Sequence, residues 1–110
     1  MLIYHMLPAH VWQAQSPTEP YCAATLATED FVHCTQEPER LLWVANQFYQ
    51  QISGDFVILC LETAQVQAEI RWEAADGHRF PHIYGPIELA AVVDVLPFPR
   101  NPNGQFLPFI

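Results

Sequence analysis

The sequence predicts a small mixed α+β domain, because short apolar runs of strand length are interspersed with one segment of helical periodicity. The chain has 110 residues, of which 51% are hydrophobic, so it is long enough to form one hydrophobic core. Ten prolines divide the chain without forming a repeat. We expect residues 1–98 to form a single domain and residues 99–110 to form a C-terminal tail that contains proline and asparagine.

The expected strands follow from the apolar runs. The run at residues 56–61 is continuous, which suits a central strand covered on both faces. Residues 80–85 are also extended in character, but Pro81 and Pro86 predict an edge strand or a loop there, because proline lacks the N–H that an interior strand donates. The other expected strands are residues 2–7, 31–35, 70–73 and 90–96.

One long helix is expected over residues 37–51, with Thr35 as its N-cap. The apolar residues that recur at helical spacing in it are Leu41, Val44, Ala45 and Phe48. A short helix is expected over residues 9–15, and residues 16–28 are predicted to be an irregular connection. The side chains expected to be buried by the short helix are Val11 and Trp12.

The charge pattern excludes several classes of partner. Four basic residues, all arginine, stand against twelve acidic residues, for a net charge of −8, which predicts no binding to nucleic acid or to an anionic membrane. The three cysteines form no CxxC pair and no segment approaches the roughly 20 apolar residues of a membrane span, so we expect a reduced, cytoplasmic protein. A small anionic ligand held by one arginine, backbone amides and imidazoles remains compatible with this charge. No pattern predicts an oligomeric state.

Three histidines lie inside apolar segments of strand character. Strand alternation places His33 on the same face as Thr35, and His82 on the same face as Tyr84. Such imidazole, hydroxyl and phenol groups can bind the hydroxyl, amide or phosphate groups of a ligand above an apolar floor. His5 shares its face with apolar residues only. The alternative for each histidine is a core residue that donates a hydrogen bond to a backbone carbonyl.

Arg71 and Glu73 share one face of a predicted strand, so they are expected to form either an ion pair or an anion clamp with a nearby base. Glu73 is the carboxylate that we consider first as a catalytic group.

This region also contains the residue types of two other kinds of chemistry, a Cys–His nucleophile and a zinc site. Cys34 follows His33 directly, and neighbouring strand residues point to opposite faces, so a Cys–His nucleophilic pair is not expected. His78 and His82, with His33 and Cys34, include ligand types that zinc favours, but Pro81 prevents a helix from aligning the first two. No metal site is therefore assigned.

Several motifs in one order resemble a known family. They are IYHMLP, LATEDFVHCT, LLWVANQFY, RWE, FPHIYGPI and AVVDVLPF. Over residues 2–98 the chain resembles an uncharacterised bacterial family, the domain of unknown function numbered 952. The resemblance implies an ADP-ribosyltransferase-like fold, which is a split antiparallel sheet with one long helix and one or more short helices. It also implies a cleft between the two halves of the sheet and NAD as a candidate cofactor.

The resemblance also implies roles for particular residues. His5 matches a first-strand histidine that contacts the nicotinamide ribose in such enzymes, and Tyr84 is similar to an aromatic residue that stacks on the nicotinamide. No residue is matched to the late glutamate of these enzymes, and Arg71 is the single arginine at a plausible pocket position where the RNA-processing relatives use several.

Together these observations predict a domain that binds a nucleotide-like or other phosphorylated small molecule. The expected catalytic residues are His33, Glu73 and His82. The expected ligand-binding residues are His5, Thr35, Arg71 and Tyr84. An ADP-ribosyltransferase-like or a phosphotransferase-like activity is the enzymatic alternative, and a non-catalytic binding or interaction module of the same fold is the other.

Overall fold

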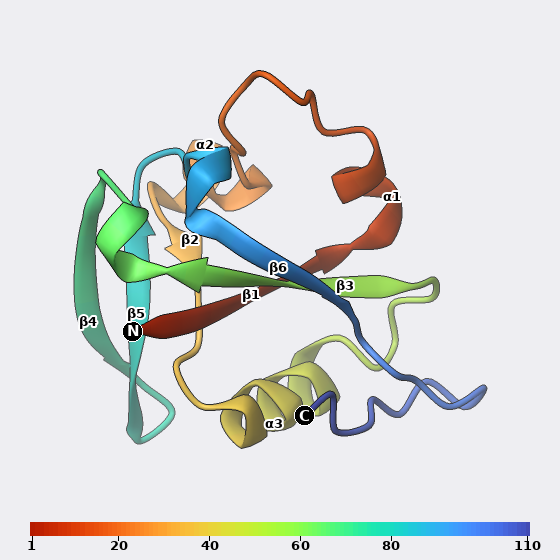
Figure 1. The fold of residues 1–110 in the computed structure, drawn as a ribbon. Helices are drawn as coiled ribbons and strands as arrows, with labels where there is room; N and C mark the ends of the chain where they lie inside the picture. Colours follow the sequence, from red (N-terminus) through yellow and green to blue (C-terminus); the bar gives the residue numbers. More distant parts are fainter.

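The computed structural model describes residues 1–110, which form six strands in two three-stranded antiparallel sheets (Figure 1). In spatial order, the first sheet contains β1 (Leu2–Pro8), β3 (Phe56–Glu62) and β6 (Val92–Pro97). The second sheet contains β2 (Val32–His33), β5 (His78–Tyr84) and β4 (Glu69–Ala75). The helices are α1 (Ala9–Gln13), α2 (Ala24–Glu29) and α3 (Pro38–Phe48), with short 3-10 turns at Thr63–Gln65 and Leu89–Ala91. The expected α+β class is confirmed.

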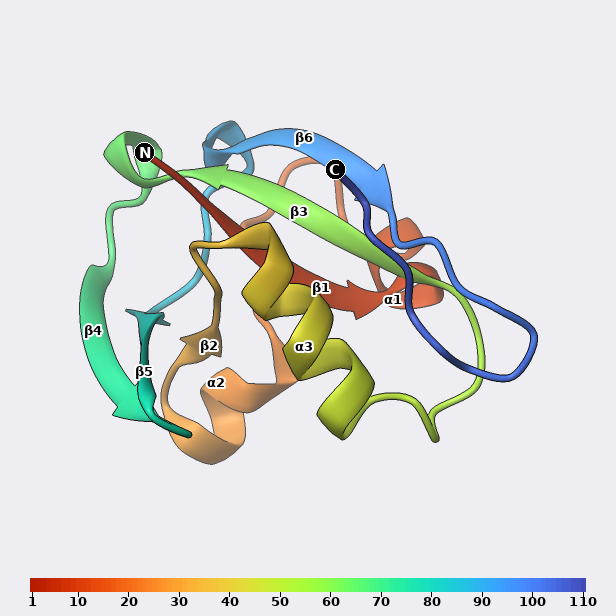
Figure 2. The ribbon, with the colours of Figure 1, turned by 90° about the horizontal axis from the view of Figure 1, so that it is seen from below.

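The first sheet has a hydrophobic core on each of its faces. Strand β3 lies in the middle of this sheet, and five of its seven residues are buried, as the continuous apolar run predicts. Side chains that alternate along β1 and β3 point to opposite faces. One face packs against Val32 and Ile83 of the second sheet, while the other is covered by Leu41 and Ala45 of α3 (Figure 2).

A backbone bridge joins the two sheets. Tyr4 of β1 and Thr35, two residues beyond β2, exchange N–H···O bonds of 2.7 and 2.8 Å. This bridge fixes the segment that follows β2 against the first strand. It therefore determines where the side chains of His33 and Thr35 lie relative to His5.

The prediction that residues 80–85 form an edge strand or a loop is wrong, because β5 is the central strand of the second sheet. Pro81 is tolerated there because β2 is only two residues long. The carbonyl of Pro81 accepts a hydrogen bond from the N–H of Cys34, which lies just past the end of β2. The side of Pro81 that lacks an N–H therefore faces the place where the pairing of β2 with β5 ends, and no bond inside the β2–β5 ladder is lost. The hairpin between β4 and β5 turns at Asp76 and Gly77, both with positive φ (50° and 78°), as expected for an Asp-Gly turn.

The helices are shorter than predicted, and one was missed. Helix α3 covers Pro38–Phe48, with Glu37 and not Thr35 at its N-cap and no side-chain capping bond. Residues 24–29 form α2, which packs Leu26 against the core, so the prediction of an irregular connection over residues 16–28 is wrong for residues 24–28. Helix α1 buries no side chain, and Val11 is 41% exposed, so the expected burial of Val11 is wrong, whereas Trp12 is partly buried against the core.

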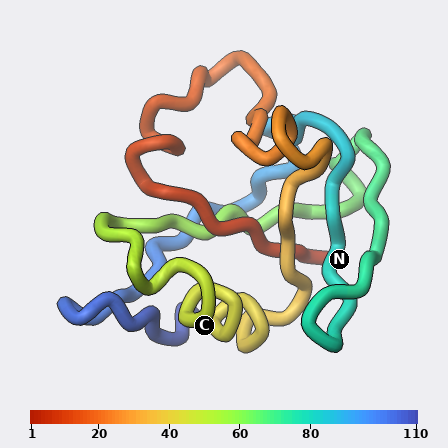
Figure 3. The backbone as a smooth tube through the Cα atoms, turned by 180° about the vertical axis from the view of Figure 1, so that it is seen from behind, coloured from red at the N-terminus to blue at the C-terminus, as the bar shows by residue number.

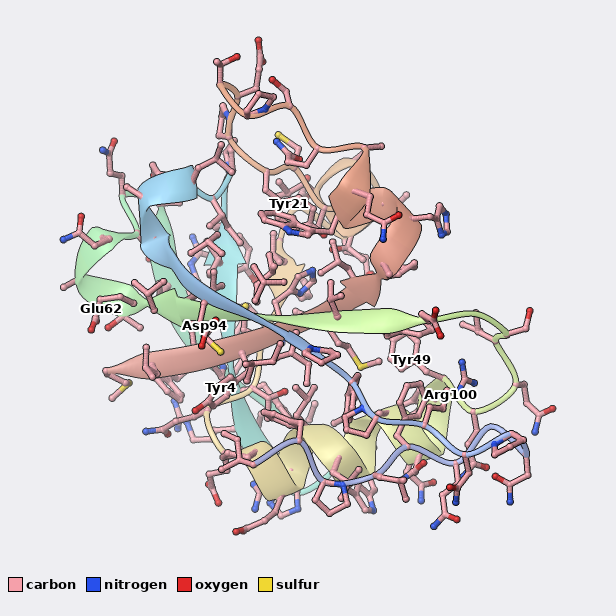
Figure 4. All side chains as sticks on the ribbon, turned by 45° about the vertical axis from the view of Figure 1, so that its right-hand side comes forward. Tyr4, Tyr21, Tyr49, Glu62, Asp94 and Arg100 are labelled. Atoms are coloured by element: carbon pink, nitrogen blue, oxygen red, sulfur yellow. The ribbon has the colours of Figure 1, made fainter.

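The C-terminal residues pack beside α3 (Figure 3). Phe106 is 1% exposed and contacts Phe56 and Phe98, and Asn46 of α3 binds both its backbone N–H and its carbonyl. Arg100 lies beside Tyr49 (Figure 4) and donates to the carbonyls at the end of α3. None of the helices combines the length and the apolar character needed to cross a membrane.

Candidate functional site

The second sheet places three of the predicted residues in one cross-strand row. His33 of β2 lies opposite His82 of β5, and His82 lies opposite Arg71 of β4. The residues next to them, such as Val32 and Ile83, are fully buried on the core side of the sheet. Because side chains alternate between faces along each strand, the row lies on the other face, where it can meet a ligand.

His82 is held by a carboxylate. Its Nδ1 lies 2.9 Å from Oε1 of Glu73, and the same oxygen accepts a short hydrogen bond from the hydroxyl of Tyr84. These two bonds, with that from Tyr84 the larger effect, hold the pKa of Glu73 below its usual value, while Glu73 raises the pKa of Tyr84. An ionised carboxylate only accepts hydrogen bonds, so Nδ1 carries the proton and the neutral ring keeps its lone pair on Nε2. No protein group binds this Nε2, so it is free to accept a proton from a ligand.

Arg71 does not pair directly with Glu73. Its guanidinium donates to Glu69 at 2.9 Å and lies over the ring of Tyr84, 4.1 Å from the ring centroid. The side chain is about half exposed, so the expected Arg71–Glu73 ion pair is wrong. The alternative expectation is an anion clamp that Arg71 forms with a nearby base. Arg71 lies beside Tyr84, where it can contact an anion, but Glu73 is not its direct partner.

His33 forms a second imidazole–carboxylate pair beside the first. Its Nε2 lies 3.2 Å from Oε2 of Glu29, and its ring centroid lies 5.2 Å from that of His82. Phe31 contacts both rings: it stacks on His82 with ring centroids 4.2 Å apart and is tilted against His33 with centroids 4.7 Å apart. Asp30, with φ 70° at the end of α2, turns the chain so that Glu29 meets His33. Two imidazoles, each with a carboxylate partner, therefore surround one phenyl ring.

His5 lies behind this group and differs from it. Its Nδ1 is 2.7 Å from the backbone carbonyl of His33 and its Nε2 is 2.9 Å from the hydroxyl of Tyr21. A carbonyl only accepts, so Nδ1 donates and Nε2 accepts from Tyr21 in the neutral ring. Burial is the main cause that lowers the pKa of His5 to about 4. Both ring nitrogens are thus occupied within the protein, as in the core-histidine alternative.

Two cavities that share part of their lining adjoin these residues. The first, which we call the outer pocket, has a volume of about 530 Å³ and lies between α2, the segment after it, α3 and the β4–β5 hairpin; His33 and His82 line it. Its apolar wall includes Val44, Phe48 and Phe80. The second, which we call the inner chamber, has a volume of about 240 Å³ and is lined by His5 and Tyr21. The outer pocket combines polar and apolar walls and has the size that is typical of small-molecule sites.

A separate polar hollow of about 450 Å³ surrounds Arg100 and contains no hydrophobic residue. Arg100 donates there to four backbone carbonyls, which belong to Tyr49, Gln50, Gly54 and Gly104. The guanidinium is therefore already bonded, and this hollow lacks the apolar surface of the other two.

Several residues of the site were not predicted. Glu29 and Phe31 flank His33, and the spacing of Glu29 and His33 (i, i+4) or of Phe31 and His33 (i, i+2) could have indicated them. Thr25 lines both cavities but lay in a segment predicted to be irregular. Cys34 also lines the outer pocket, where it is 3% exposed and burial raises the pKa of its thiol. No three His, Cys, Asp or Glu side chains converge as a metal site.

Comparison with solved structures finds the same fold in a crystal structure and in a solution structure. The crystal structure of protein CC0527 from Caulobacter crescentus matches with a TM-score of 0.81 and 24% identity, over 97% of this chain and 94% of that chain. The solution structure of CC0527 matches with a TM-score of 0.70 over 94% of this chain and 89% of that chain. At this identity the likeness shows the fold alone.

Among curated proteins, none matches the chain significantly. A family model described as "Protein of unknown function (DUF952)" matches residues 6–95. This range includes the imidazole–carboxylate pairs and most of both sheets. The chain belongs to the DUF952 family.

Proposed function

We propose that the outer pocket binds a nucleotide-like or other phosphorylated small molecule and that His82 acts on it as a general base. The observation that carries this proposal is the bond between Glu73 and Nδ1 of His82, which leaves a free Nε2 at the pocket. A carboxylate that orients an imidazole in this way fixes the tautomer that accepts a proton. Glu73 is then a positioning residue, and His82 is the catalytic residue.

The neighbouring groups suit such a ligand. His33, 5.2 Å from His82 between ring centroids, donates a proton to a leaving group or a hydrogen bond to a phosphoryl oxygen when it is protonated. The apolar wall of Phe48 and Phe80 suits the planar face of a base. Arg71 over the ring of Tyr84 supplies a cation at the edge of the same sheet face, where a phosphate can approach it from solvent.

We also propose that the two three-stranded sheets form an ADP-ribosyltransferase-like arrangement and that NAD is the first ligand to test. The support is the split into two antiparallel sheets and the first-strand position of His5. Because one fold can host many activities, this fold does not identify the reaction, which has to be tested directly.

Ligand-observed NMR with NAD, ADP-ribose, AMP and ribose 5-phosphate tests the binding part. We expect at least one of these ligands to bind at millimolar concentration or below, and we expect His33→Ala and His82→Ala to weaken it about tenfold or more. His78→Ala is the matched control, since His78 is an exposed residue of the same strand as His82. Absence of binding by all four ligands would remove the nucleotide proposal.

A second measurement separates catalysis from binding. The bound ligand is incubated with wild type and with Glu73→Gln, and its conversion is followed by chromatography. A general base held by Glu73 predicts turnover that falls in Glu73→Gln while affinity changes little. Binding without turnover in the wild type would instead indicate the non-catalytic module.

A further inference from the structure

The outer pocket and the inner chamber share one wall. Five residues line both cavities: Thr25, His33, Thr35, Val44 and Tyr49. These residues come from α2, from β2 and the segment after it, and from α3 and the residue that follows it. We call this shared wall the throat. Since the same side chains contact both spaces, the two cavities lie side by side across the throat.

The throat carries two hydroxyl groups without protein partners. Oγ1 of Thr25 is the one buried side-chain nitrogen or oxygen in the chain that has no hydrogen-bond partner. Thr35 is 4% exposed, and its hydroxyl takes part in no side-chain hydrogen bond even though its backbone is fully engaged with Tyr4. Buried polar groups are nearly always paired. The enclosed, unpaired hydroxyl of Thr25 therefore points to a partner that belongs to a ligand, and the hydroxyl of Thr35 in the same wall is free to bind the same group.

The inner chamber has a different chemical character from the outer pocket. Ten of its fifteen lining residues are hydrophobic, among them Met6 and Ile52. Two of its polar residues, His5 and Tyr21, bind each other in their neutral forms, so neither offers a charge. A cavity of about 150 Å³ in another protein holds benzene, and by that measure 240 Å³ accommodates one ring with a small substituent.

We propose that the ligand is bipartite and spans both cavities. A single-ring, mainly apolar head group occupies the inner chamber, and an acceptor oxygen next to it binds the hydroxyls of Thr25 and Thr35 in the throat. The phosphorylated or reacting part then lies in the outer pocket against His33 and His82. This inference rests on the proposed function, because it assumes that the outer pocket holds the polar part of the ligand.

Nicotinamide mononucleotide, ribose 5-phosphate and benzyl alcohol serve as probes of the whole ligand, its polar part and its head group. The variant Ala24→Leu fills the inner chamber, since Ala24 lines that cavity and not the outer pocket. Ala27→Leu is the matched control, because Ala27 is also an exposed residue of α2 and lines neither cavity. We expect Ala24→Leu to weaken the mononucleotide about tenfold or more and to leave ribose 5-phosphate unchanged.

The hydroxyls are tested with Thr25→Val and Thr35→Val, which keep the side-chain shape. Each is expected to weaken the mononucleotide about fivefold to tenfold, with no loss of melting temperature for Thr25→Val, since an unpaired hydroxyl does not stabilise the free protein. A further measurement needs no variant: the ring protons of the bound mononucleotide should show NOEs to the methyl groups of Met6 and Ile52.

The outcomes separate the two proposals. If the mononucleotide binds, and His82→Ala weakens it, but Ala24→Leu equals Ala27→Leu and no NOE to Met6 or Ile52 is seen, the bipartite ligand is refuted while the proposed function stands. If neither the mononucleotide nor any of NAD, ADP-ribose, AMP and ribose 5-phosphate binds the wild type, both proposals fail.

Discussion

Protonation of His5 should make the stability of the protein depend on pH between about 4 and 6.5. Burial lowers the pKa of this imidazole from 6.5 to about 4, so the folded protein keeps it neutral. As the pH falls through this window, the unfolded chain binds a proton that the folded chain does not. The stability present above pH 6.5 is therefore lost progressively and is fully lost near pH 4. At about 1.4 kcal/mol for each factor of ten, the loss is about 3 kcal/mol.

The assay is urea unfolding of wild type and His5→Gln at several pH values. Glutamine can still donate to the carbonyl of His33 and accept from Tyr21, but it does not titrate. Carboxylates also titrate in acid, so the quantity of interest is the difference between the two proteins. We expect the wild type to lose about 3 kcal/mol more than His5→Gln between pH 7.5 and pH 4. His10→Gln, at an exposed position, is the control. Equal pH dependence in wild type and His5→Gln would refute the reasoning.

Three further predictions concern the C-terminal segment and the Glu73 pair. Phe106→Ala should cost about 3–5 kcal/mol of unfolding free energy in urea, because Phe106 is 1% exposed among aromatic rings; a loss below about 1 kcal/mol would show that the tail is not part of the core. Arg100→Lys should lower the unfolding free energy by about 2 kcal/mol in the same assay, since an ammonium group cannot reach all four carbonyls that the guanidinium binds. An unchanged unfolding free energy would contradict these hydrogen bonds. Glu73→Gln should lower the pKa of Tyr84 toward its ordinary value, because the hydrogen bond to Glu73 is the main cause that raises it; NMR titration of the Tyr84 ring checks this, and an unchanged pKa would exclude the bond.

The strands of the fold were largely predictable, because a buried strand appears in the sequence as a run of apolar residues. The run at residues 56–61 is apolar at every position, and β3 is the central strand of the first sheet. The failure at residues 80–85 has an equally direct cause. The effect of Pro81 depends on the length of the partner strand β2, which is a property of the pairing and cannot be seen in the local sequence. A proline excludes an interior strand only where the neighbouring strand continues past it.

The candidate site was predictable in its strand residues and not in its partners. Strand alternation predicts that His82 shares a face with Tyr84, and both side chains bind Glu73, but the partner of Arg71 proved to be Glu69 and not Glu73. On β4 both carboxylates lie two residues from Arg71, so spacing alone could not choose between them. Glu73 is instead drawn to Tyr84 and His82 across the β4–β5 hairpin, whose register is set by the turn at Asp76 and Gly77.

The burial of His5 also determines which hydrogen bonds the inner chamber offers. In the neutral ring Nε2 accepts the proton of Tyr21, so the oxygen of Tyr21 keeps a free lone pair. If the ring were protonated, Nε2 would donate to that oxygen, and the hydroxyl proton of Tyr21 would have to turn elsewhere. With a pKa of about 4, the first arrangement holds throughout the neutral range. A head group with one N–H or O–H donor should therefore bind in the inner chamber more tightly than its isostere with an acceptor at that atom.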